Sequence, residues 1–123
     1  MLADIVSLLR CPHCRGPLDL RQHVLCCAQG HSFDVARQGY VNLLPRRPAT
    51  GTGDTAAMVR ARMSFLGRGH YARFADAVAR AINETGQLDE PVAEVGVGTA
   101  YYLAQVLHGR TGPGVAIDVS SAA

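Results

Sequence analysis

Two short stretches, Cys11-Pro12-His13-Cys14 and Cys27-Ala28-Gln29-Gly30-His31, decide the fold of the first part of the chain. Two cysteines separated by two residues can turn both thiolates toward one metal ion, and the later cysteine and histidine complete a set of four. Zn²⁺ takes four tetrahedral ligands of this kind in structural sites. A segment of about thirty residues buries little apolar surface, so the metal would supply the missing folding free energy.

The spacing does not decide which cysteine provides the third sulfur ligand. Cys11 and Cys14 are fixed by their separation, but Cys26 and Cys27 are adjacent, and either lies within the range found in such sites. In a strand the two side chains would point in opposite directions. We expect a hairpin from Leu18 to Leu25 to bring the second pair back to the first.

The length and the apolar pattern limit the class of protein. The chain has 123 residues, which suits one ordinary domain, or a small module with part of a larger domain. It contains no apolar run long enough to span a membrane, and Asp4 interrupts the only candidate signal segment. We therefore expect a cytoplasmic protein with no membrane association, whose reducing surroundings favour a metal site over two disulfides.

Charge is distributed unevenly along the chain. The net charge is +2 and lysine is absent, yet residues 46–80 carry seven arginines against Asp54 and Asp76. After residue 80 acidic side chains outnumber Arg110. A basic segment followed by an acidic one suggests an anionic partner for one part of the molecule. A solvated helix surface is the simpler interpretation of the charge alone.

Turn-forming residues divide the chain into three parts. Pro45 to Gly53 is rich in turn formers and holds two arginines, as linkers often do. We predict a zinc-binding module at 1–45, a linker at 46–53 and a second domain at 54–123.

The second domain begins with two predicted amphipathic helices. Asp54 is a good N-cap for the first, which Gly67 would end, and Gly86 would end the second. We expect their apolar faces to pack on the sheet that follows. The positions at helical spacing are Met58, Ala61, Phe65 and Leu66 in the first helix, and Phe74, Ala77, Val78, Ala81 and Ile82 in the second.

A β-α-β unit follows the helices. Residues 91–95 and 115–119 are short apolar segments, and 99–107 has the pattern of a helix. Such strands pair in parallel through a right-handed crossover. The turn after the first strand contains Gly96 and Gly98, which would let a ligand approach the backbone near the helix N-terminus.

The residues around this glycine turn favour one cofactor over another. A dinucleotide site prefers a third glycine where this chain has Tyr101. An S-adenosylmethionine (SAM) site has no pyrophosphate to hold. In such a site an acidic residue precedes the turn, and a second acidic residue after the next strand can accept hydrogen bonds from both ribose hydroxyls. Glu94 and Asp118 occupy these two places. The alternatives are a nicotinamide cofactor and a plain structural turn.

Taken together, these motifs resemble the bacterial 23S rRNA (guanine-N1)-methyltransferase family, which includes the tylosin-resistance-type enzymes. The resemblance covers essentially the whole chain, in the order of the family's motifs. It is carried by the zinc spacing, by His31-Ser32-Phe33-Asp34 through Gly39-Tyr40-Val41-Asn42-Leu43-Leu44-Pro45, by Gly53-Asp54-Thr55 through Gly69-His70-Tyr71, and by Glu94-Val95-Gly96-Val97-Gly98 with Ile117-Asp118-Val119-Ser120.

The resemblance implies an α/β architecture: a small zinc-ribbon-like module that recognises a ribosomal RNA hairpin, then a Rossmann-like class I SAM-dependent methyltransferase domain. The implied zinc ligands are Cys11, Cys14, Cys27 and His31. The implied SAM contacts are Tyr71, Gly98, Thr99 and the ribose-binding Asp118, to which the turn itself adds Glu94 and Gly96. Ala100 departs from the family, because the turn normally has another glycine there.

Length is the largest departure from the family. Such enzymes have a full multi-stranded sheet, so we expect this chain to hold only the first part of the domain and to have little activity by itself. No residue suggests itself as a catalytic base. A homodimer is the candidate assembly, and the family's link to antibiotic resistance adds a candidate role. The rival hypothesis is a non-enzymatic zinc-ribbon RNA-binding module with a relic methyltransferase segment.

Overall fold

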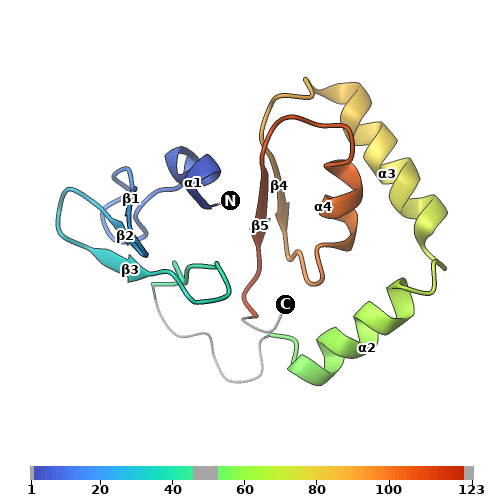
Figure 1. Cartoon of the computed structure of the whole chain (residues 1–123), viewed down its shortest axis with the longest axis horizontal. Helices are drawn as coiled ribbons and strands as arrows, with labels where there is room; N and C mark the ends of the chain where they lie inside the picture. The colour runs from blue at the N-terminus through green and yellow to red at the C-terminus, as the bar shows by residue number, and fades with distance from the viewer. Residues whose placement is uncertain (1, 46–52, 121–123) are drawn as a thin grey trace. The chain divides into compact units, whose positions relative to one another are not determined.

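A computed structural model describes residues 2–45 and 53–120. The chain divides into two compact units, Met1–Pro48 and Ala49–Ala123, which we describe separately as unit 1 and unit 2 (Figure 1). The predicted linker at 46–53 lies, apart from Gly53, outside the described residues. Within the described ranges, no helix has both the length and the apolar character needed to cross a membrane.

Unit 1 is a three-stranded antiparallel sheet preceded by two short helical turns. The strand register places Leu25 opposite both Leu20 and Phe33, and Leu25 is 0% exposed at the centre of the core. The predicted hairpin is therefore confirmed. The elements are α1 (Leu2–Ile5), η1 (Val6–Leu8), β1 (Asp19–Arg21), β2 (Val24–Cys26) and β3 (Ser32–Asp34).

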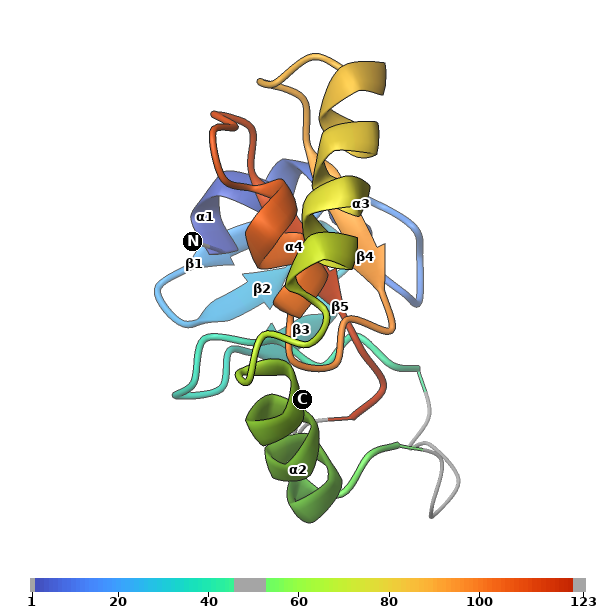
Figure 2. The same ribbon diagram turned by 90° about the vertical axis from the view of Figure 1, so that its right-hand side faces the viewer.

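Unit 2 contains the predicted helices and a two-stranded parallel sheet. Val92 pairs with Gly114 and Val95 with Ile117, so the β-α-β unit is confirmed with parallel strands. Figures 1 and 2 show α4 lying between this sheet and α3. The elements are α2 (Ala56–Leu66), α3 (Ala72–Thr85), β4 (Val92–Val95), α4 (Tyr101–Val106) and β5 (Gly114–Ile117).

The structure corrects the predicted N-cap of α2. Thr55, rather than Asp54, is the N-cap, and its Oγ1 accepts a hydrogen bond from Met58 N at 3.3 Å. Asp54 instead forms an ion pair with Arg62, two turns further along α2. Both residue types cap helices well, so the local sequence alone did not distinguish them.

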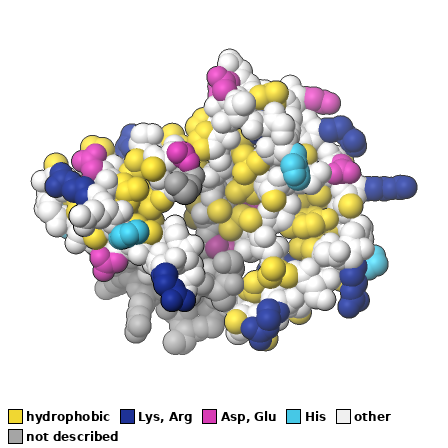
Figure 3. Space-filling view, in the orientation of Figure 1, with side chains coloured by type: hydrophobic (Ala, Val, Ile, Leu, Met, Phe, Trp, Pro, Cys, Tyr) yellow, Lys and Arg dark blue, Asp and Glu magenta, His cyan; other side chains and the backbone are white. Residues whose placement is uncertain are grey.

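The predicted apolar faces of the helices are also corrected. Helix α3 packs against α4 and buries the small residues Ala75 and Ala79, whereas Phe74 is 58% exposed. Helix α2 buries Val59 alone and has no extensive contact with the sheet. Small side chains allow two helix backbones to approach closely, which explains why the face of α3 that carries Ala75 and Ala79 is the one that packs against α4. Figure 3 shows the resulting hydrophobic side chains on the surface of unit 2.

Candidate functional site

The four predicted zinc ligands meet in unit 1. One donor atom from each of Cys11, Cys14, Cys27 and His31 lies within 4.8 Å of every other. The Sγ atoms of Cys14 and Cys27 are 3.6 Å apart, and His31 Nδ1 lies 3.3 Å from Cys27 Sγ and 3.6 Å from Cys11 Sγ. Ligands at about 2.0–2.3 Å from a tetrahedral Zn²⁺ are separated by similar distances. The sulfur separation is far too long for a disulfide, which needs about 2.0 Å.

Backbone hydrogen bonds fold each half of this set into a tight turn. Cys11 N donates to Gly16 O at 2.8 Å, and Arg15, with φ 60°, donates from its N to Cys11 O at 2.7 Å. In the second turn Cys27 N donates to His31 O at 3.0 Å. Gly30 there has φ 83°, a left-handed conformation that glycine adopts without strain. The turn residues thus aim all four side chains at one point.

The pKa values of two ligand thiols, Cys11 and Cys27, are lowered by their surroundings. Burial raises the pKa of Cys11, but hydrogen bonds from the backbone of Cys14 and His13 outweigh it, so the pKa lies below the usual 9.0. Cys27 behaves alike, through the backbone of His31 and Gln29. These two sulfurs are thus biased toward the thiolate form that binds metal.

Cys26 lies outside this set. The structure groups Cys27, and not Cys26, with the other three donors. This arrangement agrees with the ligand choice that the family resemblance implied. His13, next to the first turn, stacks its ring on Phe33 with 5.8 Å between centroids and an interplanar angle of 13°.

In unit 2 the glycine turn leaves β4 and stays open. Gly96 and Gly98 have φ 74° and 53°, values that L side chains rarely adopt. The backbone N–H groups of Gly96 and Val97 donate to Ile117 O at 2.8 and 3.0 Å, which ties the turn to the end of β5. A Cβ built on Gly96 would meet no atom within 4 Å. The backbone is therefore accessible to a ligand at this point.

Asp118 lies at the end of β5 and reaches this turn. Its Oδ2 accepts from Gly98 N at 2.8 Å, and its Oδ1 accepts from Ser120 N at 2.8 Å. These hydrogen bonds, Ser120 first, lower the pKa of Asp118 from its usual 3.8, with a smaller contribution from the positive charge of Arg62. At neutral pH the side chain is a fixed carboxylate, able to accept further hydrogen bonds.

Glu94 has a structural contact in the same region. Its Oε2 accepts from Leu103 N at 2.9 Å, in the first turn of α4. The carboxylate therefore satisfies one of the unpaired N–H groups that every helix has at its N-terminus. A role for Glu94 beside the cofactor stays a prediction.

Tyr71 is linked to the start of α4 by a series of aromatic contacts. It immediately precedes α3 and is half-exposed. Its ring lies 6.3 Å from that of Phe74, which lies 5.9 Å from that of Tyr102. Thr99, in the glycine turn, precedes α4 by two residues. Both predicted contact residues therefore lie near the first turn of α4: Thr99 through the sequence, and Tyr71 through the ring contacts of Phe74 with Tyr102.

Arg62 is a residue of this site that the sequence reasoning missed. A Cβ on Gly98 would lie 3.4 Å from Arg62 Nη1, so the guanidinium is beside the glycine turn. In the sequence Arg62 is one of the seven arginines of the basic segment, 36 positions before Gly98. Helical spacing carries no signal for such a contact, because it depends on how α2 and β4 are placed in three dimensions.

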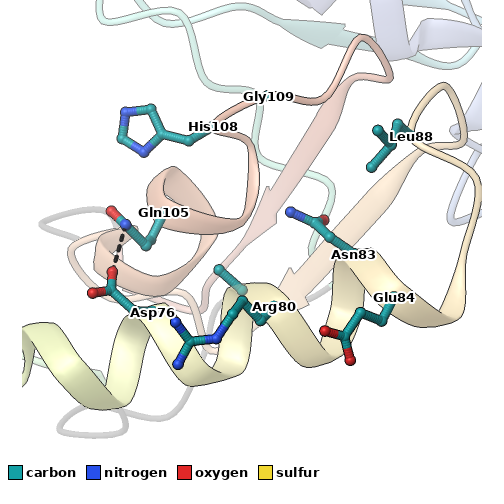
Figure 4. A pocket seen from close by; sticks show the side chains of 9 residues that line it. Asp76, Arg80, Asn83, Glu84, Leu88, Gln105, His108 and Gly109 are labelled. Atoms are coloured by element: carbon teal, nitrogen blue, oxygen red, sulfur yellow. Dashed lines mark hydrogen bonds between the residues drawn. The ribbon is translucent and has the colours of Figure 1, made fainter.

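A groove of the described surface lies away from this turn. A groove of about 530 Å³ runs between α3 and the C-terminal end of α4, away from the glycine turn at the N-terminal end. Figure 4 shows Gln105 donating to Asp76, at 2.7 Å, while His108 and Glu84 lie well apart. Its polar side chains do not converge on one point, so we place the site at the glycine turn.

Ala100 supplies a direct test of the turn. It is the N-cap of α4 with φ 54°, a left-handed conformation that costs a residue with a Cβ roughly 1–2 kcal/mol. We expect Ala100→Gly to stabilise unit 2 by about 1 kcal/mol and to raise its melting temperature by about 4–8 °C. Thermal denaturation followed by circular dichroism measures this shift. Ala104→Gly, inside α4, is the matched control and should lower stability by about 1 kcal/mol. A lower melting temperature for both variants would contradict the left-handed conformation of Ala100.

Fold and sites together define a zinc-ribbon protein with a parallel β-α-β unit whose glycine turn faces an acidic side chain. Comparison with known proteins narrows this class, because residues 9–48 match the zinc-ribbon family described as "RlmA, N-terminal". The predicted zinc ribbon is therefore confirmed.

Similarity to particular proteins extends over the whole chain. It is 43% identical over 126 residues to the 23S rRNA (guanine(748)-N(1))-methyltransferase of Streptomyces fradiae, covering 100% of this chain and 45% of that protein. It is 44% identical over 142 residues to a putative 23S rRNA (guanine-N(1)-)-methyltransferase of Micromonospora griseorubida, with 100% and 48% covered. The predicted family resemblance is thus confirmed, and this chain is a relative of the N-terminal portion of these methyltransferases. It spans about half of their length.

Proposed function

We propose that this chain supplies the RNA-recognition module and the cofactor-binding turn of a SAM-dependent methyltransferase acting on guanine N1 of large-subunit ribosomal RNA. One observation carries the proposal: the chain aligns from end to end with the N-terminal half of proteins named for this activity. Two features of the structure support it, the four convergent donor atoms in unit 1 and the open glycine turn facing Asp118 in unit 2.

Zinc has a structural role in this proposal. Cys11, Cys14, Cys27 and His31 would fill all four tetrahedral positions, leaving none for a substrate or an activated water. The ion would hold the β1–β2–β3 sheet in the shape that contacts RNA.

SAM supplies an activated methyl group when bound. The ribose hydroxyls of SAM would donate hydrogen bonds to the carboxylate of Asp118, which is already fixed by two backbone N–H groups. Gly96 and Gly98 would let the cofactor lie against the backbone, and Tyr71, Glu94 and Thr99 complete the proposed contacts. The chain's own contribution is positioning, which is a large part of catalysis when two reactants must be aligned.

Ribosomal RNA is the proposed partner, with the ribosome-containing cytoplasm as the proposed location. The exposed arginines of α2 and α3, Arg60, Arg73 and Arg80, are suited to phosphate contacts. Such contacts give affinity without reading sequence, so choice of the guanine would rest on other groups.

Calorimetric titration of SAM tests the proposal. Each hydrogen bond to a charged group contributes about 1.5–3 kcal/mol, so Asp118→Asn should weaken SAM binding at least about tenfold. Asp89→Asn, an exposed change of the same kind in the same unit, is the control and should leave the affinity unchanged. The measurement is made on the 123-residue chain and on its fusion to the C-terminal portion of the Streptomyces fradiae relative. Absence of binding in both would remove the enzyme proposal.

A second candidate is a zinc-ribbon RNA-binding module whose unit 2 is a relic. The observation that favours it is the two-stranded sheet, in which Val95 is 80% exposed. This candidate predicts RNA hairpin binding that falls steeply with salt and does not respond to SAM. A SAM-dependent RNA affinity would exclude it.

A further inference from the structure

Arg62 is held beside the glycine turn by contacts within unit 2. It forms an ion pair with Asp54, from the segment just before α2. The carbonyl oxygen of Asp54 in turn accepts a hydrogen bond from Ser120 Oγ at 2.8 Å. Ser120 lies two residues after Asp118 and donates its N–H to that carboxylate. The guanidinium is therefore anchored to the same strand end that carries the proposed ribose ligand.

The guanidinium keeps hydrogen-bonding capacity after this pairing. Arginine has five N–H donors in a planar fork, and the Asp54 pair uses Nη1. The side chain is 45% exposed, so it remains reachable from solvent. Its Nη1 lies 3.4 Å from the position of a Cβ on Gly98, and space beside Gly96 is open. A positive, planar donor group thus borders the space where a ligand would meet the turn.

The chemistry of SAM provides a matching group. One end of the cofactor is a nucleoside, whose ribose hydroxyls suit Asp118, and the other is an amino acid with a carboxylate. Carboxylates pair with the guanidinium fork through two parallel hydrogen bonds, a geometry that lysine cannot reproduce. Asp118 is hydrogen-bonded to Gly98 N at 2.8 Å, so a ligand held by Asp118 would lie along the same turn that the Arg62 guanidinium borders.

We propose that Arg62 binds the carboxylate of the amino-acid part of SAM and so sets a preference for the complete cofactor over its nucleoside fragment. This inference rests on the proposed function. Asp54 acts here as a positioning residue, because it directs the guanidinium toward the turn without contacting the cofactor.

Calorimetry with three ligands tests the inference: SAM, its demethylated product S-adenosylhomocysteine, and 5′-methylthioadenosine, which retains the nucleoside and sulfur but lacks the amino acid. We expect Arg62→Ala to weaken the first two by about 10- to 100-fold and to change the third less than about twofold. Arg62→Lys should recover part of the loss, because it keeps the charge but loses the fork. Arg60→Ala, an exposed arginine on the same helix, should leave all three affinities unchanged.

The outcomes separate this inference from the proposed function. An equal loss for all three ligands would make Arg62 a structural residue, and unchanged affinities would also overturn the inference. Retained S-adenosylhomocysteine binding with weakened RNA hairpin binding would assign the guanidinium to RNA phosphate instead. Binding of none of the three ligands by the unsubstituted chain and its fusion would overturn the proposed function and the inference together. Tight binding of 5′-methylthioadenosine and SAM with equal affinity would overturn the inference alone.

Discussion

Chelation of zinc unfolds unit 1 and leaves unit 2 folded: this is the outcome we expect when the chain is treated with a strong chelator, and Cys11→Ser should have the same effect. The buried core of unit 1 consists of Cys11, Leu18, Leu25 and Cys27, so two of its four members are proposed metal ligands. This small core, even with the partly buried apolar side chains that pack against it, cannot offset the conformational entropy of some forty ordered residues. Zinc binding contributes about 10–16 kcal/mol apparent free energy in comparable small modules, more than the stability of a typical domain.

Amide NMR spectra of the zinc-loaded and chelated chain distinguish the two units residue by residue. Signals from unit 1 should collapse into the narrow range of unfolded chains, while those of α3 and β4 keep their positions. Cys26→Ser is the matched control, because this half-buried thiol neighbours Cys27 but lies outside the donor set. It should retain one zinc ion per chain, whereas Cys27→Ser should lose it. A chelated unit 1 that keeps its dispersed spectrum would refute the metal's structural role.

The comparison of sequence with structure shows where local patterns are sufficient. The zinc donor cluster was predictable because the two-residue and three-residue spacings, with Gly16 and Gly30 nearby, determine the turns that aim the donors. The β-α-β unit was predictable for a similar reason, since apolar strands and a glycine turn are local signals. The choice between Cys26 and Cys27 needed either the family resemblance or the structure, because both spacings are allowed.

Features that depend on tertiary packing were not predictable. Helix α3 has apolar side chains on two faces, and periodicity alone could not show that Ala75 and Ala79 would meet α4 while Phe74 stays exposed. Arg62 is a sharper case. Its place beside Gly98 depends on the ion pair with Asp54 and on the hydrogen bond from Ser120 to Asp54, and the second of these joins segments far apart in the sequence.

A second large effect is expected at Gly112, in the loop that leads into β5. A Cβ at this position would lie 2.6 Å from Asp89 O and would also overlap the carbonyl oxygen of Glu90. Gly112 N donates to Leu88 O at 3.0 Å, so the two backbone segments cannot separate without losing that hydrogen bond. Overpacking against backbone typically costs 1–3 kcal/mol, and we expect Gly112→Ala to cost about 3 kcal/mol. The melting temperature of unit 2 should fall by roughly 12 °C or more.

Gly86→Ala is the matched control for this substitution. Its Cβ would lie 3.6 Å from Glu90 Oε2, an ordinary contact, and its φ of −132° suits any residue. The melting temperatures of the two variants should therefore differ by nearly the whole fall expected for Gly112→Ala. Similar melting temperatures would contradict the close packing of the loop around Gly112.

The consequence of Gly112→Ala should extend to the proposed cofactor site. Strand β5 begins two residues later, and its register places Ile117 beside Val95, which brings Asp118 within 2.8 Å of Gly98 N. Movement of the loop would disturb that register, because Gly114, the first residue of β5, packs closely against the side chain of Leu107: a Cβ there would lie 2.6 Å from Leu107 Cδ1. Gly112→Ala should therefore lower both the stability of unit 2 and its affinity for SAM, measured below the melting temperature of the variant. Gly86→Ala should leave both the stability and the SAM affinity unchanged.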